Sequence, residues 1–126
     1  MAAPNIVNVT SILGKTAYDA DVATSAATLL DNGATTNKLL KINSIIAANI
    51  DGTNDADITV FVTLQTNTNT TLFHLAKTVT VPADSSLVII SKDTSFYLEE
   101  DRAIRALASA TGDISLMVSY EEMDDA

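Results

Sequence analysis

The 126-residue chain contains no cysteine and no tryptophan, and aromatic residues make up only 5% of it. Without cysteine it forms neither disulfide bonds nor thiolate metal sites. No apolar run approaches the roughly 18 residues that a membrane-spanning helix requires, so we expect no membrane segment. The start, Met1 to Asn5, has neither the basic region nor the apolar core of a signal peptide. We therefore expect synthesis in a cytoplasm, which need not be the final location.

Basic residues are also scarce, with seven Lys and Arg against 16 Asp and Glu and a net charge of -9. An acidic surface repels phosphate backbones, so we expect no nucleic-acid partner. The same charge helps many copies to stay soluble and apart until they meet a specific partner. A hydrophobic fraction of 47% argues against disorder. The length predicts a single domain, residues 1–126, that is large enough to bury a core.

Two neighbouring segments show the alternation of β-strands. In Asp57–Gln65 the apolar residues Ile58, Val60, Val62 and Leu64 alternate with polar ones, and only Phe61 interrupts the polar face. The segment Lys38–Ile50 precedes it. There the pattern assigns one face to Leu40, Ile42, Ile46, Ala48 and Ile50, and the other to Lys41, Asn43 and Asn49. The turn-forming residues between the two segments predict a hairpin with a long loop.

Further strands are predicted at five places: Thr71–Val81, Leu87–Ile90, Phe96–Leu98, Arg102–Ser109 and Ile114–Tyr120. The N-terminal third is ambiguous. Ala17–Leu30 suits a helix or a strand, and its threonines favour a strand over Ala23–Leu30. Ile6–Val9 is either an extended arm or an edge strand. Eight or nine short strands with frequent turns predict an all-β fold, an antiparallel β-sandwich or jelly-roll barrel.

The sequence offers no catalytic apparatus. His74 is the only histidine, and no nucleophile-elbow motif accompanies it. Glu99 and Glu100 are adjacent in a strand and point to opposite faces, so they cannot act as paired acids. A charged strand end that discourages aggregation is the better interpretation. We therefore predict a protein that is not an enzyme and binds no cofactor.

One loop carries three carboxylates, Asp51, Asp55 and Asp57. An EF-hand is excluded, because the position that should carry its bidentate glutamate falls at Val62 inside a strand. A plain turn is the favoured interpretation. A calcium site formed by these three aspartates at the loop tip is the weaker alternative.

Several residues are candidates for subunit contacts. Phe61 is a large apolar group on a polar face, and interfaces use aromatic anchors of this kind. The N-terminal segment 1–14, an extended arm with Ile6, Val7 and Val9, is suited to adding a strand to a neighbour's sheet. Arg102 and Arg105 are expected to pair with the acidic residues 99–101 or with a neighbouring subunit.

Three blocks of the chain resemble a group of small virion proteins of marine tailed phages, notably cyanophages. The first block is Ala3–Val9 with Ile12–Ala17, and the second is Lys38–Ile45 with Ala48–Gly52. The third comprises Tyr97–Glu100, Ile104-Arg105 and Ser119–Glu122. The likeness runs over nearly the whole chain, although its motifs are strand-like and none is a chemical signature. Residues 17–37 and 65–71 match least.

The resemblance implies a small β-sandwich structural protein, present in many copies on the virion after synthesis in the host bacterium's cytoplasm. Within that class it favours a capsid decoration (cement) protein that binds the major capsid protein and stabilises the assembled shell. A homotrimer at local threefold positions is the expected oligomer. A neck or tail component is the first alternative. A carbohydrate- or host-binding module is the second, suggested by Phe61, Tyr18, Tyr97 and the polar segment 65–71.

Overall fold

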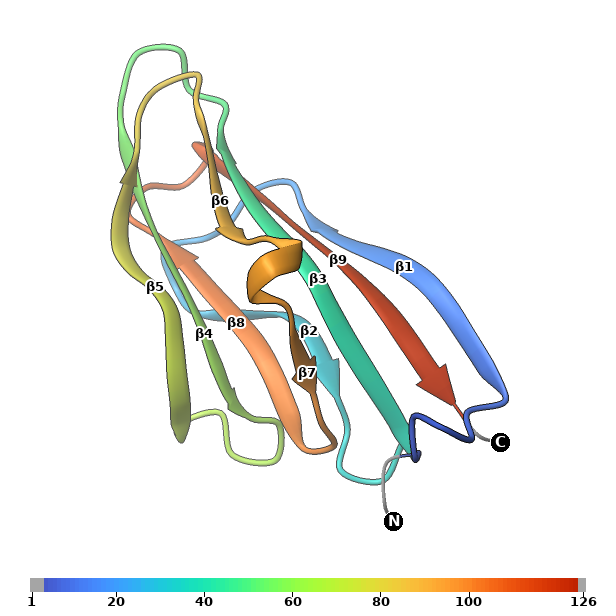
Figure 1. Ribbon diagram of the computed structural model, residues 1–126. Helices are drawn as coiled ribbons and strands as arrows, with labels where there is room; N and C mark the ends of the chain where they lie inside the picture. Colours follow the sequence, from blue (N-terminus) through green and yellow to red (C-terminus); the bar gives the residue numbers. More distant parts are fainter. Residues whose placement is uncertain (1–3, 125–126) are drawn as a thin grey trace.

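The computed structural model describes residues 4–124, which form two antiparallel sheets packed face to face (Figure 1). One sheet has the strand order β1-β9-β3-β6, with β7 also paired to β3, and the other has the order β2-β8-β4-β5. The strands are β1 (Ser11–Asp19), β2 (Ala27–Asn32), β3 (Lys38–Asn49), β4 (Ala56–Leu64), β5 (Thr71–Val81), β6 (Ser86–Ile90), β7 (Phe96–Leu98), β8 (Arg102–Ala108) and β9 (Ile114–Asp124). A single 3₁₀ turn, η1 (Lys92–Thr94), separates β6 from β7 in this part of the chain.

The connections identify the topology as a jelly roll. β4 and β5 form a hairpin within one sheet, whereas nearly every other connection crosses from one sheet to the other. β6 and β7 pair with different parts of β3, so together they occupy one strand position. Four strand positions therefore face four, in the order of two interlocked Greek keys. The predicted all-β fold, an antiparallel β-sandwich or jelly-roll barrel, is confirmed. The predicted hairpin between segments 38–50 and 57–65 is wrong, because β3 and β4 lie in different sheets and their connection crosses between them.

The core lies between the sheets and is built mainly from β-branched side chains, which fit a pleated surface well. Ile42, Ile45, Ile58, Ile104 and Ile114 are fully buried there. Six of the predicted segments coincide with strands to within one residue at each end, and β9 continues beyond its predicted end to Asp124. No helix within residues 4–124 is long and apolar enough to span a membrane.

A β-bulge in β3 overturns the predicted division of its faces. The pairing with β9 shifts between Ile42 and Ser44, so one extra residue enters the strand. Beyond the bulge, Ile45 and Ala47 point into the core, and Ile46 turns to the outer face of the sheet. The prediction that placed Ile46 on the face of Ile42 is therefore wrong, because a period of two holds only where no residue is inserted.

The predicted extended arm over residues 1–14 is not formed in the part of it that the structure describes. β1 begins at Ser11 and pairs with β9 along its full length, so residues 11–14 belong to the chain's own sheet. Ile6 and Val7 form a turn, neither an extended arm nor an edge strand. Residues 1–3 of the predicted arm lie outside the described part of the chain. β2 begins at Ala27, four residues later than the predicted start at Ala23.

Candidate functional site

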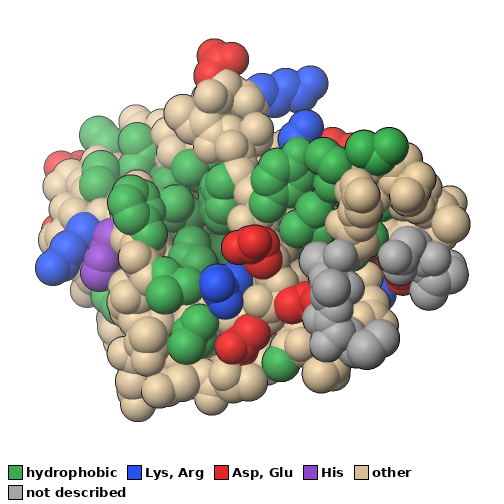
Figure 2. Space-filling view, turned by 60° about the horizontal axis from the view of Figure 1, so that its bottom comes forward, with side chains coloured by type: hydrophobic (Ala, Val, Ile, Leu, Met, Phe, Trp, Pro, Cys, Tyr) green, Lys and Arg blue, Asp and Glu red, His purple; other side chains and the backbone are tan. Residues whose placement is uncertain are grey.

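The sandwich is open along one edge, where β5 of one sheet faces β7 of the other. There a hollow of about 420 Å³ opens between the sheets. We call it the open-edge groove. Its lining is mostly apolar and comprises Val62, Leu72, Phe73, Leu75, Ile90, Thr94, Phe96, Tyr97, Leu98, Glu99 and Arg102. Figure 2 shows hydrophobic side chains gathered in a broad band across the molecule, with single acidic and basic side chains among them.

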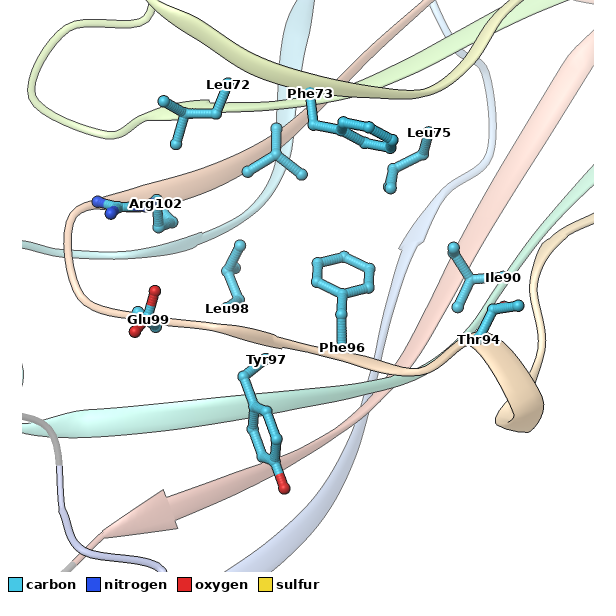
Figure 3. Close-up of a pocket in the computed structure, with 11 residues that line it drawn as sticks. Leu72, Phe73, Leu75, Ile90, Thr94, Phe96, Tyr97, Leu98, Glu99 and Arg102 are labelled. Atoms are coloured by element: carbon cyan, nitrogen blue, oxygen red, sulfur yellow. The ribbon is translucent and has the colours of Figure 1, made fainter.

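Strand alternation aims the side chains of β7 (Figure 3). Phe96 and Leu98 point across the groove toward Phe73 and Leu75 of β5, whereas Tyr97 points to the opposite side of the strand. Phe73 is opposite Val62 of β4 and so belongs to the inner face. It is nevertheless 66% exposed, because no strand closes this edge of the sandwich.

Both strands at the groove are edge strands. β5 pairs with β4 alone and the three-residue β7 pairs with β3 alone among the strands of residues 4–124. Natural edge strands are usually protected by charged residues, proline or a covering loop. The stretch of β5 at the groove, Leu72 to Leu75, carries no Asp, Glu, Lys or Arg. An exposed apolar edge of this kind is typical of interaction surfaces.

Two charged residues lie at one end of the groove. Figure 3 shows Glu99 and Arg102 near each other beyond Leu98. The Arg102 guanidinium donates from Nη1 to the carbonyl oxygens of Glu100, at 3.3 Å, and Asp101, at 3.2 Å. Within residues 4–124 it makes no salt bridge to a carboxylate. The predicted pairing of Arg102 with the neighbouring acidic side chains is therefore not made in the isolated chain.

Phe61 lies on the outer face of its sheet, as the alternation predicts, but it is not exposed. It is opposite His74 on β5 and Arg105 on β8, and only 8% of its surface remains accessible. Arg105 donates from Nη2 to the carbonyl oxygen of Ala26 at 2.9 Å, and its buried Nε has no partner in this part of the chain. The expectation that Phe61 is exposed is therefore wrong, and its role in a subunit interface stays a prediction.

The outer face of the larger sheet carries a row of apolar side chains that crosses four strands. Tyr18 is opposite Met117, Met117 is opposite Ile46, and Ile46 is opposite Val88. We call these four residues the outer row. Tyr18 is 74% and Val88 58% exposed. A hollow of about 510 Å³ borders the first three of these residues. Sequence reasoning missed the outer row, because it depends on the bulge in β3 and on cross-strand register.

The three loop aspartates do not converge. Asp51 accepts hydrogen bonds from the turn N–H groups that follow it, which lower its pKa. Asp55 accepts from the Ala83 N–H at 3.1 Å, and Asp57 accepts from the Thr80 hydroxyl at 2.7 Å. No group of three potential His, Asp or Glu ligands gathers anywhere in residues 4–124. Each carboxylate accepts hydrogen bonds from a different part of the chain, as in an ordinary turn, which supports the plain-turn interpretation.

No protein-family model and no curated protein sequence matches the chain. A protein of Bacillus endospore appendages, described as a novel family of disulfide-linked pili, is 14% identical, with 92% of this chain and 90% of that chain covered and a TM-score of 0.53. A protein of infectious bursal disease virus strain Gx is 11% identical, with 92% and 33% covered and a TM-score of 0.50. A capsid protein of the Helicobacter pylori bacteriophage KHP30 is 8% identical, with 92% and 94% covered and a TM-score of 0.49.

These likenesses concern the fold. The jelly-roll sandwich is shared with proteins of viral particles and of a pilus, at identities too low to carry over an activity or a partner. The finer resemblance to virion proteins of marine tailed phages stays a prediction.

Proposed function

We propose that the protein is a virion structural component, a decoration protein that attaches to an assembled capsid and stabilises it. One observation carries the proposal: a small jelly roll exposes two separate apolar surfaces, the open-edge groove and the outer row. Apolar surfaces of this kind suit a protein whose role is contact with other proteins. The fold likeness to virus proteins and the resemblance of the three sequence blocks both support this role.

A decoration protein stabilises a shell by mass action. It binds the assembled shell and not the dissociated subunits, so its binding free energy is added to that of the shell. The net charge of -9 keeps unbound copies apart in solution. We assign the contact with the major capsid protein to the outer row, because its four side chains lie on one sheet face and span its strands from β1 to β6. We also propose that the protein is a homotrimer on the shell.

The likeness to the appendage protein favours a second candidate, a subunit of an extracellular filament, because it covers almost all of both chains. The pili of that family are described as disulfide-linked. The present chain has no cysteine, so a filament of it would be held by non-covalent contacts alone. Decoration is therefore the better-supported role, because it requires no covalent crosslinks.

The proposal is tested on capsid shells purified without the protein. Added protein is expected to co-sediment with the shells to a saturating ratio of many copies per particle and to raise the temperature at which they open. Val88→Asp should abolish both effects, because it places a charge in the outer row. Thr35→Asp, which makes the same charge change in an exposed loop away from that face, is the matched control. Failure of the wild-type protein to bind would refute decoration, and a few copies per particle would indicate a neck or tail component.

A further inference from the structure

The N-terminal segment ends in a turn of unusual composition. The N–H of Asn8 donates to the carbonyl oxygen of Asn5 at 2.8 Å, and the Val7 N–H donates to the Asn5 side-chain Oδ1 at 3.0 Å. The two central positions are thus Ile6 and Val7, which are 53% and 84% exposed. Turn centres are normally Gly, Pro, Asn, Asp or Ser. Two β-branched aliphatic residues at an exposed tip oppose both the local preference and the hydrophobic effect. Burial against another molecule would remove that cost.

The turn is held in place at both ends. Pro4 precedes it and is buried. Thr10 follows it and donates from its N–H and its hydroxyl to the carbonyl oxygen of Asp124, at 2.9 and 3.1 Å. A partner that binds a loop fixed in this way loses little conformational entropy, because the loop is already ordered. The exposed tip is therefore presented as a preorganised contact.

The open-edge groove suits this tip, because both are mainly apolar and neither carries a net charge on its side chains. The first 14 residues carry no charged side chain. The groove lining contains one acidic residue, Glu99, and one basic residue, Arg102. The chain has a net charge of -9, so contacts between its acidic surfaces are opposed by repulsion. The tip carries no charged side chain and the groove carries one of each sign, so contact between them adds little electrostatic repulsion.

We propose that the Ile6–Val7 tip of one copy inserts into the open-edge groove of a second copy. The turn lies at the start of β1 and the end of β9, and β3 separates these strands from β7 at the groove (Figure 1). With both of its ends fixed, the turn cannot reach the groove of its own chain. The contact joins two different surfaces and is therefore head-to-tail, so repeated contacts close into a ring or extend as a filament. The inference does not depend on the proposed virion role.

Sedimentation velocity over a range of concentrations tests the contact. The wild-type protein is expected to associate as its concentration rises. Val7→Asp alters the tip, Phe73→Asp alters the groove, and each should move association to at least tenfold higher concentration. Val88→Asp is the matched control, because it introduces the same charge at an exposed apolar site of the outer row. It should associate like the wild type while failing to bind shells, which separates this contact from the proposed decoration role.

Mixing the two defective variants distinguishes a head-to-tail contact from a symmetric one. The Val7→Asp protein keeps an intact groove and the Phe73→Asp protein keeps an intact tip, so an equimolar mixture should form a 1:1 dimer and nothing larger. A wild-type protein that stays monomeric at all concentrations would refute the proposal. So would a Val7→Asp protein that associates like the wild type, because another segment would then fill the groove.

A fluorescence probe keeps the test valid should Phe73→Asp fail to fold. The chain has no tryptophan, so Phe73→Trp provides a single reporter inside the groove. Its emission is expected to shift to shorter wavelength as the protein associates. The shift should disappear when Val7→Asp is combined with it. A shift that persists in the double variant would show that the tip is not the occupant.

Discussion

Phe61 on β4 packs beside His74 on β5, with ring centroids 5.4 Å apart and an angle of 35° between the ring planes. The pair lies where the pairing of β4 with β5 shifts register, with irregularities on both sides of it. Cross-strand aromatic contacts stabilise such pairings. Because β5 also forms one wall of the open-edge groove, this contact on the outer face helps to fix the position of Leu72 and Phe73 on the inner one.

Phe61→Ala is expected to lower the free energy of unfolding by about 2 to 3 kcal/mol, because it removes a nearly buried ring. This loss is at the low end of the losses found for Phe→Ala at core positions, since Phe61 lies on the outer face of its sheet. His74→Ala should cost less, since His74 is exposed. A double-mutant cycle in urea should give a coupling energy of about 0.5 to 1 kcal/mol for the pair. Additive effects would show that the rings do not stabilise each other.

Much of the fold follows from alternation alone. β5 and β7 have the bounds that their sequences predict, and β4 differs by one residue at each end. β1 was missed, because Ser11–Asp19 is an edge strand whose side chains are mostly exposed, so its sequence lacks a strong apolar stripe. The face reversal in β3 was missed because a bulge leaves no sign in the hydrophobic pattern.

The candidate surfaces are less accessible to sequence reasoning than the strands. Phe73 lies on the inner face of β5, yet its exposure depends on the absence of a covering strand, which is a property of the tertiary structure. Phe61 shows the converse, since residues on neighbouring strands cover it. Ile6 and Val7 were predicted contact residues, and the structure exposes both. What the sequence could not provide was the turn that presents them.

The Asp113 carboxyl should make stability fall as the pH rises. Desolvation, followed by the nearby Asp51 carboxylate, raises the pKa of Asp113 above its usual range. The contribution of Asp113 to the free energy of unfolding is fully present below the pKa that Asp113 has in the unfolded chain. It is lost as the pH rises through the pKa that Asp113 has in the folded protein. Asp113→Asn should therefore have a higher melting temperature than the wild type at pH 7 and no advantage near pH 3. Asp93→Asn, at an exposed position in η1, controls for net charge, and an equal gain from it would contradict the assignment.

Asp101 should have the opposite pH dependence. Its carboxylate accepts the Thr66 N–H at 2.8 Å and the Thr66 hydroxyl at 3.1 Å, and these hydrogen bonds lower its pKa. The stabilisation is present above the unfolded pKa and is lost as the pH falls through the folded pKa. Asp101→Ala should therefore lower the melting temperature at pH 7 and have a smaller effect in acid. Asp101→Asn should lose less, because asparagine keeps an acceptor and tolerates the backbone φ of 61° at this position.

Asn32 is buried to 2% exposure at the end of β2 and joins three segments of the chain. Its Nδ2 donates to the carbonyl oxygens of Lys38, at 2.9 Å, and Leu98, at 3.1 Å, and its Oδ1 accepts from the Thr36 hydroxyl. Asn32→Ala leaves both carbonyls without this donor, and we expect a loss of about 2 to 4 kcal/mol in the free energy of unfolding.

Equilibrium urea denaturation measures the loss caused by Asn32→Ala. Asn69→Ala, at an exposed position in the loop between β4 and β5, is the matched control and should change stability by less than about 0.5 kcal/mol. The Leu98 carbonyl belongs to β7, so hydrogen exchange should also be faster at the β7 amides of the Asn32→Ala protein than in the wild type. A loss equal to that of the control, with β7 protection unchanged, would show that Asn32 does not fix β7 against the start of β3.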